Sequence, residues 1–438
     1  MRLLRTVLAG TAAAALAVCG SVAVVASPAS AADVGAQGTF TSLSSTRILD
    51  SRTGNGAPKQ IVGQGATVRL KVAGRAGVPL WPVSAVVLNL TVTGARGNGY
   101  LTAYPDGSAR PTAASISFAK GWTRANTVTV PLGESGYVNI FQSSLGAHVI
   151  ADVTGYYSGT TEGIPGSTYL PDATQWRLDD TRADGAAPLP GGSSIRYSVY
   201  FPDDPVRSSA ITAYVVNLTA VNPRTTGYLT TWDGFGPAPS GVSALNYGIG
   251  GVWPNSAIVQ ATGCLFCTDP SLKMFGVYTS GTTHWLVDVV GYYVDTLDGL
   301  RFTPVPPQRI LDTRTTSAIG AGASRTVDGT AAATPETLSL SVNVTAVAPT
   351  ANTYLTVWPE GQRPTVSMLN PNKGETVSNG TTAGVNALNQ FQIYNRSGAS
   401  NVVVDVSGRF EYVPLTTTAR AAQGLTPSGR PGETQRSR

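Results

Sequence analysis

The segment that decides the fold class is VIADVTGYY, Val149–Tyr157. It is rich in β-branched and aromatic residues, which favour strands. The same pattern returns as LVDVVGYY over Leu286–Tyr293 and as VVVDVSGRF over Val402–Phe410. A strand-like segment that recurs three times predicts three copies of one all-β module.

Three further segments precede each copy, always in the same order. An opening segment with an Arg-x-x-Asp-x-Arg pattern is followed by one containing Asn and Thr, and then by one that begins Tyr-Leu-Thr. The opening segments are Arg47–Arg52, Arg177–Arg182 and Arg309–Arg314; the second are Val86–Thr91, Tyr214–Thr219 and Leu340–Thr345; the third are Tyr100–Tyr104, Tyr228–Trp232 and Tyr354–Trp358. Four segments repeated in order define the module as a unit of the chain.

The repeat sets the domain boundaries at 38–158, 168–295 and 300–413. Short linkers separate the copies, so we expect beads in a row or modules packed end to end. Each module has seven or eight short strand-like segments separated by turn residues, in roughly 120 residues. This pattern predicts tandem antiparallel β-sandwiches, with a small closed barrel as the alternative.

The two ends of the chain differ from the modules. Residues 1–31 have the features of a signal peptide: Arg2 and Arg5, an apolar stretch, and the cleavage pattern Ala29-Ser30-Ala31. They predict a secreted, extracellular protein with no membrane attachment after cleavage; association with the cell wall is compatible with this prediction. Residues 414–438 are rich in Thr, Arg, Gly, Ser and Pro, which predicts a disordered tail.

Charge gives little indication of partners. The net charge of the chain is +5, and only 13% of its residues are charged. Two positive charges belong to the signal segment and others to the tail, so the modules are close to neutral. Because no basic stripe is interleaved with aromatic residues, we expect no nucleic-acid partner.

The four segments resemble the repeat module of uncharacterised secreted and cell-wall-associated proteins of actinobacteria. The resemblance covers roughly residues 38–413. It rests on the family's RILDTR, LNVT, GYLTVWP and VDVxG motifs, which this chain matches in order, for example as RILDTR at 309–314, LNLT at 88–91, GYLTAYP at 99–105 and VDVVG at 287–291. Such modules often accompany hydrolase domains, which implies an accessory, binding or adhesive role. The resemblance supplies no catalytic residue. Module 2 departs most from the pattern, since Asp179 replaces an apolar residue of the opening.

Acids and arginines recur at fixed places in the modules. A carboxylate inside an apolar strand must be paired, hydrogen-bonded or protonated. We therefore interpret these residues as a buried structural polar network that joins the first and last strands. A polar ligand site and a calcium site are the alternatives. The set consists of Asp50, Arg52, Asp152, Asp180, Arg182, Asp288, Asp312, Arg314 and Asp405.

Loop residues ahead of a recurring asparagine are the candidates for ligand contact. Trp122 and Trp253 lie in what looks like the same loop of modules 1 and 2, and Val377 takes that place in module 3. A tryptophan in a loop is a better candidate for stacking on a ligand than one in a strand, because strand aromatic residues usually pack in the core. The candidate ligand-binding set is Trp122, Trp253, Asn126, Asn255 and Asn379.

The remaining reactive residues do not indicate catalysis. His148 and His284 occupy equivalent places, and Asn401 replaces them in module 3, so a catalytic histidine is disfavoured. Cys264 and Cys267 predict a local disulfide, because an exported protein meets an oxidising environment. No metal site or cofactor is expected.

Repetition without a unique catalytic group favours a non-enzymatic binding or adhesive protein that recognises cell-wall or environmental polysaccharide. A structural spacer or surface-layer protein that binds other proteins is one alternative. A polysaccharide hydrolase is the other, since paired acids are compatible with glycoside hydrolysis.

Overall fold

The computed structural model describes residues 36–201, 204–413 and 431–437. The expected signal peptide at 1–31 lies outside the described residues, as do residues 414–430 of the expected tail. None of the helices in the described ranges has the length and apolar character needed to cross a membrane.

Module 1 folds into two antiparallel sheets that face each other. One sheet has the strand order β1-β8-β3-β6 and the other has β2-β7-β4-β5. This order is that of an eight-stranded jelly roll, a sandwich of two sheets. The strands are β1 (Phe40–Asp50), β2 (Thr67–Lys71), β3 (Val83–Thr93), β4 (Gly99–Pro105), β5 (Ile116–Phe118), β6 (Arg124–Pro131), β7 (Tyr137–Gln142) and β8 (His148–Ser158).

Module 2 repeats this topology, with sheets β14-β11-β17-β9 and β13-β12-β16-β10. The short helix α1 (Pro205–Ala210) precedes its third strand, and the Asp204 side chain caps the helix by accepting from the Arg207 N–H. The strands are β9 (Thr168–Asp180), β10 (Ser194–Val199), β11 (Ile211–Val221), β12 (Gly227–Trp232), β13 (Leu245–Tyr247), β14 (Val252–Gln260), β15 (Thr262–Gly263), β16 (Lys273–Thr279) and β17 (His284–Val294).

Module 3 has sheets β18-β24-β20-β22 and β19-β23-β21. Its strands are β18 (Arg301–Asp312), β19 (Ala323–Asp328), β20 (Thr337–Val347), β21 (Leu355–Trp358), β22 (Thr376–Gly384), β23 (Gln390–Asn395) and β24 (Asn401–Glu411). Short 3-10 turns lie at Ala183–Gly185, Thr313–Thr315 and Thr330–Ala332. The predicted sandwich is confirmed in all three modules, and the closed-barrel alternative is wrong because the two sheets of each module remain separate.

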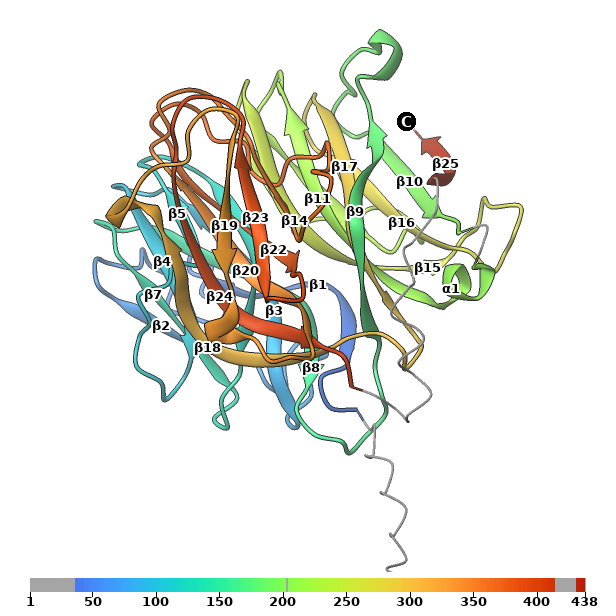
Figure 1. Cartoon of the computed structure of the whole chain (residues 1–438), viewed down its shortest axis with the longest axis horizontal. Helices are drawn as coiled ribbons and strands as arrows, with labels where there is room; N and C mark the ends of the chain where they lie inside the picture. Colours follow the sequence, from blue (N-terminus) through green and yellow to red (C-terminus); the bar gives the residue numbers. More distant parts are fainter. Residues whose placement is uncertain (1–35, 202–203, 414–430, 438) are drawn as a thin grey trace, which may run out of the picture.

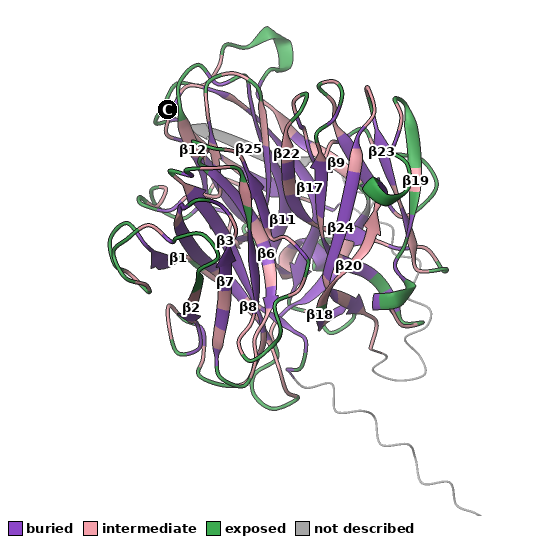
Figure 2. Cartoon of the chain, turned by 90° about the vertical axis from the view of Figure 1, so that its left-hand side faces the viewer, coloured by how far each residue is buried: buried purple, intermediate pink, exposed green. Residues whose placement is uncertain are grey.

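Each module has its own apolar core between its two sheets. The alternate residues of the long strands face inward, as in Leu88 and Leu90 of β3 or Val342 and Val344 of β20. Figure 2 shows these strands buried and the connecting loops exposed. The cores therefore follow from period-two alternation within each strand.

The end of the tail differs from the expectation of disorder. Pro431–Ser437 form strand β25, which pairs antiparallel with the edge strand β10 of module 2. An edge strand presents unpaired N–H and C=O groups, and backbone pairing to it does not require an apolar sequence. Composition alone therefore could not reveal this strand.

The three modules close into a ring around a common centre, which corrects the expectation of beads in a row or end-to-end packing (Figure 1). The edge strands β6, β14 and β22 contact one another at that centre. Contacts between module 1 and module 3 close the ring, although these modules are the most distant in sequence. We call the line along which the three edge strands meet the axis.

Six aromatic residues, two from each module, pack together in one buried cluster at one end of the axis. We call them the aromatic hub: Phe40, Tyr157, Tyr169, Tyr293, Phe302 and Phe410. Each module supplies one from its first strand and one from its last. Ring centroids pair across modules at 4.1 Å for Tyr157–Phe302, 4.2 Å for Phe40–Tyr293 and 4.7 Å for Tyr169–Phe410. Each such pair adds about 1 kcal/mol beyond area burial.

The hub explains the glycine of the VDVxG segment. A Cβ built on Gly155 would lie 2.3 Å from the Phe40 ring, and one on Gly408 would lie 2.2 Å from the Phe302 ring. At Gly291 the nearest atom is the Tyr169 hydroxyl, at 2.5 Å. Glycine is therefore required because the aromatic ring of the first strand lies directly on it.

Candidate functional site

Asparagine side chains join the modules along the axis. The amide Nδ2 donates to a partner Oδ1 in the next module in three equivalent bonds: Asn255 to Asn89 at 3.1 Å, Asn379 to Asn217 at 2.9 Å and Asn126 to Asn343 at 2.9 Å. We call these six residues the asparagine ring. Each of the three bonds crosses a different interface, so the ring is closed.

The three predicted ligand residues Asn126, Asn255 and Asn379 are part of this ring and almost fully buried. Their Oδ1 atoms accept from backbone N–H groups of Gly380, Thr127 and Ser256 in neighbouring modules. Both ends of each amide are thus bonded within the protein. The ligand-binding interpretation of these residues is wrong, because module association buries the strand edges that carry them.

The recurring acids and arginines make one ion-pair arrangement in every module. The strand acid pairs with the first arginine of the opening segment: Arg47–Asp152 at 2.8 Å, Arg177–Asp288 at 2.8 Å and Arg309–Asp405 at 2.9 Å. The opening aspartate pairs with the last arginine: Asp50–Arg52 at 2.7 Å, Asp180–Arg182 at 2.7 Å and Asp312–Arg314 at 2.6 Å. The pairs of the strand acids link the first strand of each module to its last strand, whereas the other three lie within the opening segment.

The two kinds of acid differ in their electrostatics. Burial raises the pKa of Asp152, Asp288 and Asp405, and the paired arginines oppose this shift. Hydrogen bonds from Arg314 lower the pKa of Asp312 to about 2, and equivalent bonds lower the pKa of Asp50 and Asp180. The opening aspartates are therefore firmly ionised, while the strand acids depend on their arginines.

Trp122 lines an open groove of about 660 Å³ between module 1 and module 3, which we call the Trp122 groove. Module 1 contributes Tyr100 at the start of β4 and Trp122 just before β6. Module 3 contributes Arg309 and Arg314 of its opening segment, and Glu375 just before β22. The groove thus combines two aromatic rings with charged groups from two modules.

Several groups in this groove face solvent. Tyr100 is 38% exposed and the Arg314 side chain is 48% exposed. The hydrogen bonds of the Arg314 guanidinium to Asp312 use Nε and Nη2, which leaves Nη1 without a bond among the described residues. Asp405 lies at the floor of the groove, paired with Arg309.

Trp253 does not share the position of Trp122. Strand pairing aligns Arg124 with Val92, Trp253 with Ala220 and Val377 with Ala346, so Arg124, Trp253 and Val377 are the equivalent residues. The expected equivalence of Trp122, Trp253 and Val377 is therefore wrong, because Trp122 lies two residues earlier than the other two. The equivalents of Trp122 are Gly251 and Glu375.

The buried guanidinium of Arg124 lies between the two tryptophans. Its Cζ is 4.9 Å from the Trp122 ring centroid and 4.6 Å from that of Trp253. Burial lowers the pKa of Arg124 to about 10, with Glu375 opposing the shift. Trp253 Nε1 also donates to Gly250 O at 2.6 Å. Trp253 is therefore occupied in packing, and Trp122 is the predicted ligand residue that reaches a groove.

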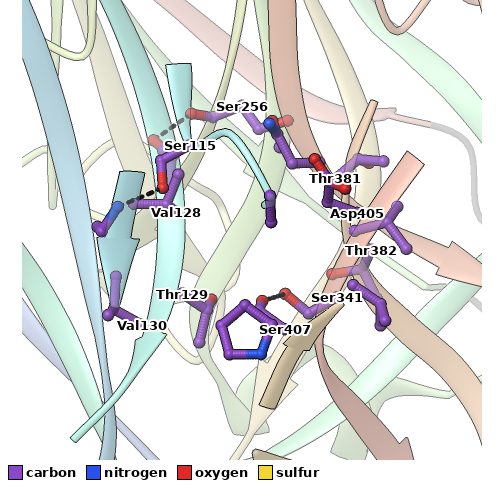
Figure 3. Close-up of a pocket in the computed structure, with 18 of the residues that line it drawn as sticks. Ser115, Val128, Thr129, Val130, Ser256, Ser341, Thr381, Thr382, Asp405 and Ser407 are labelled. Atoms are coloured by element: carbon purple, nitrogen blue, oxygen red, sulfur yellow. Dashed lines mark hydrogen bonds between the residues drawn. The ribbon is translucent and has the colours of Figure 1, made fainter. Parts of the chain in front are cut away.

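A smaller cavity lies beside the axis, mainly between module 1 and module 3 (Figure 3). Figure 3 shows Ser341 and Ser407 hydrogen-bonded to each other on one side and Val128 and Val130 on the other. The residues of module 2 equivalent to Ser341 and Ser407 are Val215 and Val290. Small hydroxyl side chains in place of valines leave this space open.

The histidines make the same kind of contact in modules 1 and 2. Nδ1 of His148 lies 3.1 Å from Ser51 Oγ, and Nδ1 of His284 lies 3.3 Å from Thr181 Oγ1. In module 3, Thr313 Oγ1 lies 3.3 Å from the amide Oδ1 of Asn401. Because an amide can take the place of the imidazole, the contact positions the opening segment against the last strand.

Two further features concern cysteines and metal ligands. Cys264 and Cys267 form the predicted disulfide. It closes the connection between β15 and β16, beside Leu272 and Met274. Within residues 36–201, 204–413 and 431–437, no three His, Cys, Asp or Glu side chains are grouped so as to hold a metal ion.

Comparison with known proteins adds little to this geometry. No family model and no curated protein matches the chain. Among the solved structures that match is one from work described as "The Triple Jelly Roll Fold and Turret Assembly in an Archaeal Virus". It has 8% sequence identity, covers 86% of this chain and 90% of that chain, and has a TM-score of 0.16. A TM-score this low carries no argument about this protein.

Proposed function

We propose that this chain is an exported, non-catalytic protein that binds polysaccharide, and that the Trp122 groove is its main glycan site. The observation that carries the proposal is the meeting of Tyr100, Trp122 and Arg314 in one solvent-open groove between two modules.

The chemistry of the groove suits sugars. Aromatic faces pack against the C–H faces of a pyranose ring, and an indole or phenol also offers a polar group. Ionised groups form strong hydrogen bonds to hydroxyls, and Arg314 and Glu375 can do so from the module 3 wall. The opposite charges of the arginines and acids nearly balance, which favours a neutral glycan over a strongly charged one.

The groove also gives a role to the ring arrangement. Its two walls come from module 1 and module 3, so a single module in isolation lacks one wall. Glycan binding by this groove therefore requires the closed ring.

The test is glycan-array screening and cell-wall pull-down with the chain lacking residues 1–31. We expect retention of at least one polysaccharide, and Tyr100→Ala should weaken it at least tenfold, which corresponds to about 1.4 kcal/mol. Tyr228→Ala is the matched control, because Tyr228 has the same position in module 2 and packs against Tyr278 as Tyr100 packs against Phe141.

Absence of any retained glycan, together with absence of wall association, would overturn the proposal in favour of a spacer or protein-binding role. Equal losses in Tyr100→Ala and Tyr228→Ala would show that binding occurs elsewhere. Turnover of a polysaccharide would favour the hydrolase alternative.

A further inference from the structure

A second pocket lies at a different interface, between module 1 and module 2. Its volume is about 190 Å³, and we call it the Phe235 pocket. Module 1 contributes Ser44 of β1 and Thr154 of β8. Module 2 contributes Thr231 of β12, Gln260 of β14, and Asp233 and Phe235 from the loop after β12.

The polar groups of the pocket retain free hydrogen-bonding capacity. Gln260 Oε1 accepts from Ser44 Oγ at 3.2 Å, and Asp233 Oδ1 accepts from the Phe235 N–H at 3.0 Å. Gln260 Nε2, Asp233 Oδ2 and Thr231 Oγ1 make no hydrogen bond to any described residue. One amide donor, one carboxylate acceptor and one hydroxyl therefore remain available to a ligand.

An apolar surface accompanies these groups. The Phe235 side chain is 64% exposed at the edge of the pocket. An exposed aromatic ring beside hydroxyl, amide and carboxylate groups is the composition expected of a site for a polyol ring, since one face of such a ring is apolar and its rim is polar.

The size and charge of the pocket narrow the ligand further. A volume of 190 Å³ is below the range of pockets for drug-sized ligands, roughly 300–1,000 Å³, so one ring fits and a chain does not. Asp233 is the one ionisable side chain that lines it, which disfavours an anionic ligand.

Pseudo-symmetry shows that the pocket is particular to this interface. The equivalents of Thr231 are Ala103 in module 1 and Val357 in module 3, and those of Thr154 are Val290 and Ser407. The corresponding space between modules 3 and 1, which Ala103 and Ser407 line, is the smaller cavity of Figure 3.

We infer that the Phe235 pocket binds one neutral sugar residue, as a second saccharide site distinct from the Trp122 groove. The inference rests on the proposed function for its ligand class, but on different residues and a different interface. With two sites on one chain, a branched or long glycan gains avidity when both are filled.

The experiment uses the chain lacking residues 1–31 and a panel of neutral sugars: glucose, galactose, mannose, arabinose and N-acetylglucosamine. Calorimetry and ligand-observed NMR would measure saturable binding. The variant T154V/T231V removes two hydroxyls but introduces valines that module 2 and module 3 carry at these places. It should therefore fold, which thermal unfolding would check. Thr326→Val on the exposed face of β19 is the matched control.

We expect at least one sugar to bind the unmodified chain, with affinity at least tenfold weaker in T154V/T231V and unchanged in T326V. Equal affinity in T154V/T231V and the unmodified chain would overturn the inference, as would no saturable binding of any of these sugars.

The two proposals fail separately. Polysaccharide binding that Y100A weakens, together with no sugar binding in the Phe235 pocket, would leave the Trp122 groove as the glycan site and reject the second site. Sugar binding that T154V/T231V weakens, together with polysaccharide binding that Y100A leaves unchanged, would reject the groove and retain the pocket.

Discussion

Asn126 Nδ2 donates a 2.9 Å hydrogen bond to Asn343 Oδ1, and this bond joins the first module to the last. The two residues are far apart in sequence; Asn126 is buried in β6 and Asn343 is half-buried in β20. Equivalent bonds, Asn255–Asn89 and Asn379–Asn217, join the other interfaces. The modules are therefore one closed assembly in which each contributes equally to the axis.

The first prediction concerns Asn126. Replacing it with alanine removes its bond to Asn343 and its acceptor for the Gly380 N–H, and leaves the half-buried Asn343 Oδ1 and the buried Gly380 N–H without these partners. Unsatisfied buried groups cost about 1–3 kcal/mol each, so Asn126→Ala should lower the free energy of unfolding by about 3 kcal/mol. Urea unfolding measures this. Asn139→Ala, at a partly exposed amide bonded to Asp106, is the control and should cost under about 1 kcal/mol. Equal costs would contradict the role of the ring.

The second prediction concerns Gly155. A Cβ there would lie 2.3 Å from the Phe40 ring, which the aromatic hub holds in place. Gly155→Ala should therefore destabilise the chain by about 2 kcal/mol or more through overpacking. Gly63→Ala is the control, because no atom lies within 4 Å of its added Cβ. Thermal unfolding of the two variants should separate them clearly, and similar midpoints would show that the hub yields to a methyl group.

The third prediction concerns pH. The pKa of Asp312 in the folded state is about 2, below its ordinary value of 3.8. The folded state therefore binds fewer protons at Asp312 than the unfolded state does. Its contribution to stability is fully present above the unfolded pKa and is lost as pH falls through about 2. The contribution of Asp405 to the pH dependence of stability has the opposite sign. Burial raises the pKa of Asp405, so the folded state binds its proton more tightly than the unfolded state does, and protonation of this group favours folding.

Carboxyl NMR titration would check this order, with Asp405 titrating above Asp312. Arg314→Lys removes the two-point contact and should raise the pKa of Asp312 toward 3.8. Arg325→Lys, at a half-buried arginine bonded to Ser317, should leave the Asp312 titration unchanged. An unchanged titration in Arg314→Lys would show that another group holds this carboxylate ionised.

The fourth prediction concerns the disulfide. The Cys264–Cys267 bond closes a loop with a sequence separation of 3. The chain-entropy treatment gives a short loop of this size a stabilisation of about 2 kcal/mol. C264S/C267S should therefore lower the free energy of unfolding by at most about that amount. The variant should retain its glycan affinity, because the disulfide lies within module 2 and the Trp122 groove lies between modules 1 and 3. Loss of glycan binding in this variant with the fold intact would be contrary to the proposed site.

Much of the fold of each module was open to prediction. The segments around Val149–Tyr157 and their copies are strands because β-branched residues and period-two alternation act locally. The order of four repeated segments gave the module boundaries, and the apolar surroundings of Asp152 required a partner, which is Arg47. The disulfide followed from two nearby cysteines and the expectation that the protein is exported.

The candidate site was only partly open to prediction. Trp122 was a candidate for ligand contact and lines a groove, but the second wall of that groove belongs to module 3. Trp253 packs on Arg124 instead, because a two-residue difference in register separates it from Trp122. Tyr100 and Arg314 were visible in the sequence as repeated residues, yet nothing in the sequence placed them together.

The sequence by itself determined the strands, the sandwich and the number of modules, since these depend on side-chain alternation within a few residues. The tertiary structure alone decided that the modules close into a ring, that Asn126 binds Asn343, and that Pro431–Ser437 pair with β10. The physical reason is that a hydrogen-bond donor on a strand edge does not specify its acceptor. The acceptor is fixed when whole modules pack, and burial of the aromatic hub sets that packing.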